Sequence, residues 1–196
     1  MRAERAGQYI LQKLTQELPP HFTYHNANHT LDVHNAALTI ARAEGVNEAE
    51  TDLLLAAAWY HDAGYLEGIT DHEEVSCRIT KQYLPEFGYN DKEIAIIRSM
   101  IRATRLPQAP QNHVEQILAD ADLDYLGRTD FAVISEKLYT ELKHLGAVTN
   151  AEDWDKKQVK FLQEHQYFTK TSINTRQAQK ELNLAEIKAR LHLHEK

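Results

Sequence analysis

An all-α protein is predicted by two features of the 196-residue sequence. Apolar residues recur over most of the chain with the helical period of about 3.6 residues, in place of the alternation typical of strands. Glycine, proline and asparagine separate these segments, where they end one helix or cap the next. Hydrophobic residues are 42% and charged residues 26%, which excludes a disordered or fibrous chain. We expect one domain over residues 1–196, without an internal repeat or a dividing linker.

The first two helices are predicted from their faces and their ends. The first runs from about Ala3 to Leu18, because its apolar residues share one face and Pro19-Pro20 ends it. An irregular turn over residues 22–28 follows. Asn28 is the expected N-cap of a second helix, which continues to Gly45.

The third and fourth helices surround a glycine stop. The third begins near Asn47 and carries the longest apolar run, Leu53–Tyr60, before it stops at Gly64. This run is far shorter than the roughly 20 apolar residues that a membrane-spanning helix needs. Asp71 and Glu74 predict a capping box at the start of the fourth helix.

The remaining helices follow the same punctuation, with the proline-containing loop 107–110 between two of them. Asn90 or Asp91 opens the next helix, and Gly127 is the expected stop of the one after it. The later predicted ranges are about 90–101, 112–125, 130–145, 152–167 and 172–191.

Charge and cysteine content limit the partners. The net charge is −7 without a basic run, so polymeric nucleic acid is not expected, whereas a small phosphate ester remains compatible with a metal site. The start Met1–Arg5 leads into an amphipathic segment, not a signal peptide, and we expect a cytoplasmic protein without membrane contact. The single Cys77 is expected to act as a small apolar residue. The oligomeric state is left open by the sequence.

Three short segments combine histidine and aspartate. His25 and His29 lie four residues apart, His61-Asp62 follows the apolar run, and Asp120 and Asp122 stand between apolar residues. An imidazole and a carboxylate at a buried helix end are costly to desolvate, and a divalent ion offsets that cost. This donor set suits Mg, Mn, Fe, Co, Ni or Zn and leaves positions open for water. Taken singly, each segment is also compatible with surface, capping or arginine-pairing roles.

In this order, the segments resemble the HD-domain superfamily of metal-dependent phosphohydrolases. The stretch Tyr24–Val33 is also similar to the Tyr-His-Asn-x-x-His-x-x-Asp-Val signature of class I cyclic nucleotide phosphodiesterases. The resemblance runs from Tyr24 to about Gly127. It implies an HD-type helical bundle, with a metal-site core at about 20–128 and additional C-terminal helices at about 129–196 packed on it.

The resemblance also implies roles for individual residues. The metal ligands would be His29, His61, Asp62 and Asp122, holding one or two divalent ions, with Asp62 as the bridge to a second ion. His25 would be the general acid for the leaving oxygen, and a metal-bound water would attack phosphorus. A loop imidazole bonded to the backbone is the alternative role for His25.

Three further residues are candidates for the substrate phosphate or a second metal. His72 belongs to a His-Glu motif that many bacterial HD proteins carry, and it is also compatible with a solvated helix start. Arg102 and Arg105 are candidate phosphate ligands, although charged helix residues are usually solvated.

Asp120 is expected to orient a histidine or cap a helix. Tyr65, beside the His-Asp pair, is compatible with packing or with the wall of a base pocket.

The function expected from this resemblance is hydrolysis of a phosphate ester or anhydride of a small molecule, a nucleotide, by a phosphodiesterase or nucleotidase type of reaction. One alternative is an HD-type di-iron oxygenase, which needs a further histidine in the helix that here reads Met100–Arg105, without one. The other alternative is a non-catalytic nucleotide-sensing module.

Overall fold

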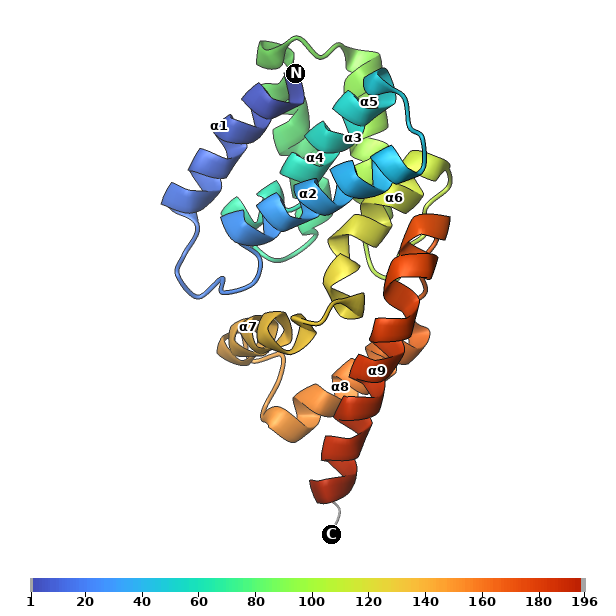
Figure 1. Cartoon of the computed structure of the whole chain (residues 1–196). Helices are drawn as coiled ribbons and strands as arrows, with labels where there is room; N and C mark the ends of the chain where they lie inside the picture. The colour runs from blue at the N-terminus through green and yellow to red at the C-terminus, as the bar shows by residue number, and fades with distance from the viewer. Residues whose placement is uncertain (1, 195–196) are drawn as a thin grey trace. The chain divides into compact units, whose positions relative to one another are not determined.

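The computed structural model describes residues 2–194, and this part of the chain contains helices without strands (Figure 1). The prediction of an all-α fold is therefore confirmed. The α-helices are α1 (Arg2–Glu17), α2 (Ala27–Ala43), α3 (Glu48–Tyr60), α4 (His72–Tyr83), α5 (Asp91–Ala103), α6 (His113–Asp122), α7 (Phe131–His144), α8 (Ala151–Glu164) and α9 (Lys170–His194). Short 3₁₀ helices are η1 (Ala63–Leu66), η2 (Leu84–Phe87) and η3 (Asp124–Gly127).

The chain divides into two compact units. Unit 1 comprises the residues up to Pro19 together with His25–Leu123, and unit 2 comprises Pro20–Tyr24 together with the residues from Asp124 onward. The expectation of a single domain stays a prediction.

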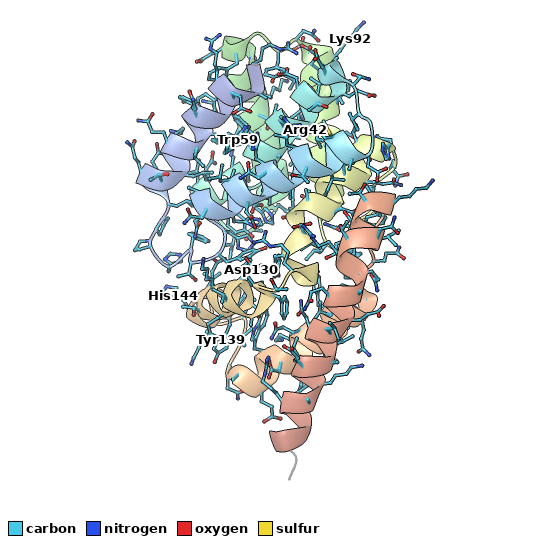
Figure 2. All side chains as sticks on the ribbon, in the orientation of Figure 1. Arg42, Trp59, Lys92, Asp130, Tyr139 and His144 are labelled. Atoms are coloured by element: carbon cyan, nitrogen blue, oxygen red, sulfur yellow. The ribbon has the colours of Figure 1, made fainter. Side chains whose placement is uncertain are left out.

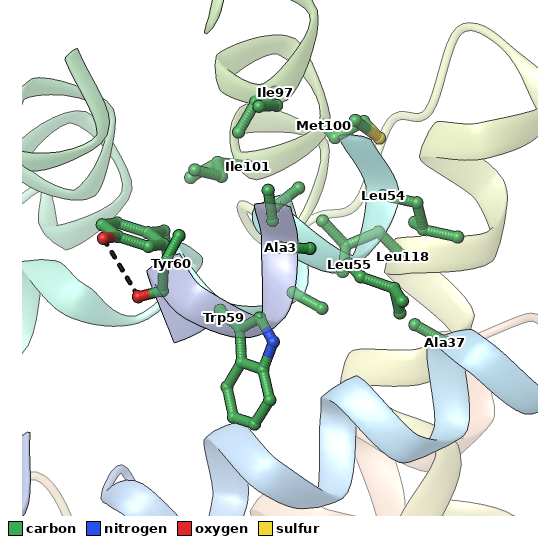
Figure 3. Packing of buried hydrophobic residues seen from close by; sticks show 14 of the residues in the cluster. Ala3, Ala37, Leu54, Leu55, Trp59, Tyr60, Ile97, Met100, Ile101 and Leu118 are labelled. Atoms are coloured by element: carbon green, nitrogen blue, oxygen red, sulfur yellow. Dashed lines mark hydrogen bonds between the residues drawn. The ribbon is translucent and has the colours of Figure 1, made fainter. Parts of the chain in front are cut away.

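Helix α3 is the centre of unit 1. It is apolar on nearly every face, which suits a helix that is buried on all sides. Helices α1, α2, α5 and α6 all pack against it. Figure 3 shows Leu54 and Leu55 of α3 close to Met100 of α5 and Leu118 of α6, and all four side chains are buried. Because α3 is buried, the helices packed around it, including α2 before it and α6 after it in the sequence, come close to its C-terminal end.

The aromatic end of α3 packs toward α1. Trp59 (labelled in Figure 2) is buried in unit 1. A Cβ atom on Gly7 of α1 would come within 2.4 Å of its indole. The Tyr60 hydroxyl donates a hydrogen bond of 3.3 Å to the Ala6 carbonyl (Figure 3). Glycine at position 7 therefore permits α1 to approach α3 closely.

Asparagine residues cap five of the helices in residues 2–194, including α5, which begins after Asn90. The side chains of Asn26, Asn47, Asn112 and Asn150 accept hydrogen bonds from backbone N–H groups at the starts of α2, α3, α6 and α8. The prediction of Asn28 as the cap of α2 is wrong by two residues, because Asn28 is already helical and donates its N–H to Asn26 Oδ1 at 2.9 Å.

The capping box lies at α5 and not at α4. Asn90 and Glu93 bond reciprocally to each other's backbone N–H groups, as a capping box requires. The prediction of a capping box from Asp71 and Glu74 is wrong, since Asp71 adopts a left-handed conformation with φ 50° and makes no side-chain cap. Glu74 instead accepts two hydrogen bonds from Arg102. Glu74 therefore pairs with Arg102 of another helix and does not form the local cap with the backbone at Asp71.

Unit 2 is held together by polar contacts at its interior. The fully buried Glu141 of α7 accepts a hydrogen bond of 2.8 Å from Tyr24 N–H. In α9, the Asn183 amide donates to the carbonyls of Leu126 and Arg128, and Arg176 pairs with Asp124 at 2.7 Å. Within residues 2–194, no helix has the length and hydrophobicity needed to span a bilayer.

Asp52 fixes the first turn of α1 in unit 1. Asp52 is buried, and its carboxylate accepts hydrogen bonds from Ala3 N–H, Arg2 Nε and the Tyr89 hydroxyl at 3.0–3.2 Å. We expect Asp52→Ala to lower the free energy of unfolding by about 1–3 kcal/mol, because it leaves buried donors without an acceptor. Urea denaturation measures the change. Asp52→Asn, which keeps one acceptor oxygen, should lose less; equal stability of wild type and Asp52→Ala would contradict this role.

Candidate metal centre

Four polar side chains of unit 1 converge at the C-terminal end of α3. His29 comes from the first turns of α2, His61 and Asp62 follow the last residue of α3, and Asp122 is the last residue of α6. His29 Nε2 lies 3.2 Å from Asp122 Oδ1 and 3.4 Å from Asp62 Oδ2. His61 Nε2 lies 3.2 Å from Asp62 Oδ2, 3.5 Å from Asp122 Oδ1 and 3.4 Å from His29 Nε2. Two imidazole nitrogens and two carboxylate oxygens therefore face one point.

A hydrogen bond from Nδ1 of His61 orients the ring so that Nε2 can act as the ligand atom. Its Nδ1 lies 2.8 Å from the Ala58 carbonyl oxygen, which only accepts hydrogen bonds. Nδ1 therefore carries a proton in either charge state of the ring, and Nε2, which faces the carboxylates, is the atom that would bind a metal as a lone-pair donor once it has lost its own proton. The ring is completely buried, so its orientation is fixed.

The donor set fits a divalent ion. Asp62 Oδ2 is buried and, within the described part of the chain, has no hydrogen bond of acceptable geometry. A buried carboxylate oxygen in that state is costly, and a cation at the point of convergence would satisfy it. Imidazole and carboxylate ligands bind such ions at about 2.0–2.2 Å, which places neighbouring ligand atoms roughly 3.3 Å apart. His29, His61 and Asp122 also form a cluster with ligand atoms within 4.8 Å of one another.

Opposite charges stabilise one another within this cluster. Burial by itself would lower the pKa of His61, but the negative charges of Asp62 and Asp122 raise it well above the ordinary value. The pKa of His29 is raised in the same way, against burial, by Asp122 and Asp62. Burial opposes ionisation of the carboxylates, but the two histidines hold the pKa of Asp122 at about 2 and that of Asp62 well below its usual range. Both carboxylates are therefore ionised and ready to bind a cation.

Comparison with known proteins assigns the family. The family model described as HD domain matches residues 26–124, which contain all four convergent side chains. The chain belongs to the HD-domain family. A crystal structure of a protein from Lactobacillus plantarum has the same fold, with a TM-score of 0.67 over 98% of this chain and 97% of that chain, at 22% sequence identity. A comparison with curated proteins finds no match.

HD domains bind divalent metals, and the convergent cluster lies where the HD dipeptide of this chain, His61-Asp62, ends α3. The sequence-predicted ligands His29, His61 and Asp122 are brought together, and Asp62 lies beside them. Asp120, two residues from Asp122, is fully buried and is not a member of this cluster.

Three aromatic rings line one side of the HD site. The His25 ring stacks on Tyr65 with centroids 4.3 Å apart, and the Tyr65 ring stacks on His72 at 4.4 Å. The His25 ring centroid also lies 6.0 Å from that of His29. His72 Nε2 lies 3.6 Å from Asp62 Oδ1, the oxygen that faces away from His61. His25 and His72 are thus both placed near the cluster.

The two arginines predicted as phosphate ligands are engaged with carboxylates of α4. Arg102 donates to both Glu74 oxygens at 2.7 and 3.0 Å. Arg105 contacts Glu73 Oε2 at 3.4 Å and Asp71 Oδ1 at 3.3 Å. Glu73 in turn places Oε1 3.7 Å from His72 Nε2, so Arg105 is connected to the site through one carboxylate and Arg102 is not.

Glu73 and Ser76 were not singled out as separate site residues by the sequence, beyond the His-Glu motif around them. Glu73 is buried, and its contact with His72 forms because the two residues begin α4. The Ser76 hydroxyl, also buried, accepts a hydrogen bond of 2.7 Å from Gly64 N–H. This contact links the turn after the HD dipeptide to α4.

The metal centre predicts a defined loss on substitution. We expect Asp62→Ala to lose tight binding of a divalent ion, because it removes the oxygen that faces both imidazoles. Chelator-treated protein is reloaded separately with Mg, Mn, Fe, Co, Ni or Zn ions, and metal content is measured after dialysis. A bound ion at 100 times its Kd should also stabilise the wild type by about 2.7 kcal/mol. Asp91→Asn, which changes an exposed carboxylate at the start of α5, is the control. Equal metal content in wild type and Asp62→Ala would contradict the assignment.

Gly64 predicts a second effect, on the approach of α4. A Cβ atom at this position would lie 2.0 Å from the His72 carbonyl oxygen. Gly64→Ala should therefore push the start of α4 away and lower the free energy of unfolding by about 2–3 kcal/mol. Gly45→Ala is the matched control, since its Cβ would meet nothing within 4 Å and only its φ of 73° is strained. Urea denaturation of both variants tests this; a smaller loss for Gly64→Ala than for Gly45→Ala would contradict it.

Proposed function

We propose that this HD domain is a metal-dependent phosphohydrolase that cleaves a phosphate ester or anhydride of a small molecule, a nucleotide. The observation that carries the proposal is the convergence of His29, His61, Asp62 and Asp122 around Asp62 Oδ2, a buried oxygen that faces both imidazoles. The HD superfamily consists generally of metal-dependent hydrolases, which agrees with this donor set.

His29, His61, Asp62 and Asp122 would hold the ion. When bound, a divalent ion supplies the positive charge that activates water and neutralises the phosphate oxygens. The carboxylate of Asp62 has two faces: Oδ2 points to His29 and His61, and Oδ1 lies 3.6 Å from His72 Nε2. This division supports Asp62 as the bridging ligand and His72 as a ligand of a second ion or of the phosphate.

His25 is the general acid in this proposal. Hydrolysis breaks one P–O bond, and the departing oxygen needs a proton when it is a poor leaving group. An imidazole supplies that proton near neutral pH. His25 lies beside the ligand His29 but has its ring stacked on Tyr65, which leaves it outside the ligand cluster.

Arg105 is the better candidate of the two arginines for binding the substrate phosphate. Its side chain is 45% exposed, and its guanidinium contacts Glu73, the carboxylate next to His72. A phosphate that entered beside His72 would compete with Glu73 and Asp71 for the same guanidinium. Arg102 remains a candidate but would have to leave a two-bond pair with Glu74.

We further propose a cytoplasmic protein whose partner is the small phosphorylated substrate. The net charge of −7 without a basic run disfavours polymeric nucleic acid as the partner. The phosphodiesterase-like stretch around His25 favours a diester among the nucleotide substrates.

Metal-loaded wild type should hydrolyse members of a panel of cyclic nucleotides, nucleoside monophosphates and nucleoside triphosphates, and Asp62→Ala should not. His25→Gln should retain the metal but lower kcat about 10²- to 10⁴-fold on these substrates, because the leaving oxygen is no longer protonated. The loss should be much smaller with bis(4-nitrophenyl) phosphate, whose leaving group needs no proton. Phosphate release and nitrophenolate absorbance are the measurements.

The rival functions have separate signatures in the same assay. Oxygen uptake by the iron-loaded protein with turnover of the substrate would indicate an oxygenase. Nucleotide binding without turnover by any metal form would indicate a sensing module. Equal hydrolysis by wild type and Asp62→Ala would contradict the proposed mechanism.

A further inference from the structure

Tyr65 links the two histidines that lie beside the metal ligands without belonging to their cluster. His25 precedes α2 and His72 begins α4, so the two are distant in sequence. Both imidazole rings nevertheless stack on the single ring of Tyr65, at interplanar angles of 18° and 29°. The Tyr65 side chain is buried, with 8% of the residue exposed.

The backbone of Tyr65 is fixed relative to the metal ligands. Its N–H donates a hydrogen bond of 3.1 Å to the Asp62 carbonyl in the 3₁₀ helix η1. Helix η1 packs against α4, where Gly64 N–H donates to Ser76 Oγ at 2.7 Å. The ring of Tyr65 therefore has a defined position with respect to both Asp62 and the start of α4.

Stacking restricts the rotation of each imidazole about its Cβ–Cγ bond, which decides where the ring nitrogens point for proton transfer or ligation. The torsion that turns a histidine ring about its Cβ–Cγ bond has broad minima, so an imidazole without a flat neighbour samples many orientations. The face of Tyr65 limits that rotation for both rings. With the His72 ring held, its Nε2 stays 3.6 Å from Asp62 Oδ1.

We propose that Tyr65 is a positioning residue that holds the His25 and His72 rings in the orientation required for turnover. Its catalytic consequence rests on the proposed phosphohydrolase function. Tyr65 acts through its ring face, so a phenyl ring replaces it and an aliphatic side chain does not. Its loss misorients the acid and the His72 imidazole while leaving the four ligands in place.

The experiment compares Tyr65→Phe and Tyr65→Leu with wild type. Tyr65→Leu should lower kcat by about 10- to 100-fold with KM and metal content unchanged, because misplaced catalytic groups slow the chemical step more than binding. Tyr65→Phe should retain nearly full kcat. Tyr83→Leu is the matched control. It also removes a tyrosine ring from this region, at the last residue of α4, but that ring packs on Tyr9 with centroids 5.0 Å apart and lies away from the site. Thermal unfolding of each variant reports any general loss of stability.

A second readout does not depend on activity. In the metal-loaded protein, the ring current of Tyr65 should shift the imidazole C–H resonances of His25 and His72, which are assigned among the 11 histidines with His25→Gln and His72→Gln. These shifts should persist in Tyr65→Phe and Tyr83→Leu and collapse in Tyr65→Leu.

The outcomes separate this proposal from the proposed function. An inactive wild type would refute phosphohydrolase function, and the resonances would still show whether the Tyr65 ring lies against both imidazoles. An active wild type with unchanged kcat or unchanged imidazole resonances in Tyr65→Leu would overturn the positioning role. An equal loss of kcat in Tyr65→Phe and Tyr65→Leu would overturn it as well, because the hydroxyl and not the ring face would then be the active part.

Discussion

The structure of unit 1 depends on the burial of charge at the end of α3. Asp62 and His61 lie in an apolar interior, where an isolated charge is costly. The side chains of His29 and Asp122 lie next to them and supply compensating charges. With both imidazoles protonated, the positive and negative charges of the four groups cancel, in agreement with the raised pKa of the histidines and the lowered pKa of the aspartates. A divalent ion with neutral imidazoles gives the same sum. Protons and metal are thus alternative solutions to one electrostatic constraint.

The same helix explains why the ligands come from separate segments. Because α3 is apolar on nearly every face, it has to be surrounded, and α2 and α6 pack along it. The side chains of His29 and Asp122 on these neighbours then reach its end. Gly64 allows the chain to turn directly beneath the start of α4, which brings His72 to the other face of Asp62. Core packing and ligand placement are therefore consequences of one arrangement.

Much of this was predictable from the sequence, and the reasons for the failures are physical. Helical periods and asparagine caps are local signals, so the helices were found with ends shifted by a few residues. The four convergent side chains are those that the resemblance to the HD-domain superfamily implied as ligands, and their role as ligands stays a prediction. Glu74 was misassigned because a capping box and an Arg102 pair use the same carboxylate, and only tertiary packing decides between them. The role of Tyr65 was not predictable, since stacking on two histidines far apart in sequence has no local pattern.

A chain of polar contacts runs outward from the metal cluster. Asp62 is followed by the His72 imidazole, then by the Glu73 carboxylate and finally by the half-exposed guanidinium of Arg105, which also contacts Asp71. The Arg105 guanidinium is held by the two carboxylates of Glu73 and Asp71. A ligand that bound this guanidinium would have to displace Glu73 or Asp71, and an anion would replace the lost negative charge whereas a neutral molecule would not. Under the proposed function, this exchange is the step by which a substrate phosphate would reach Arg105.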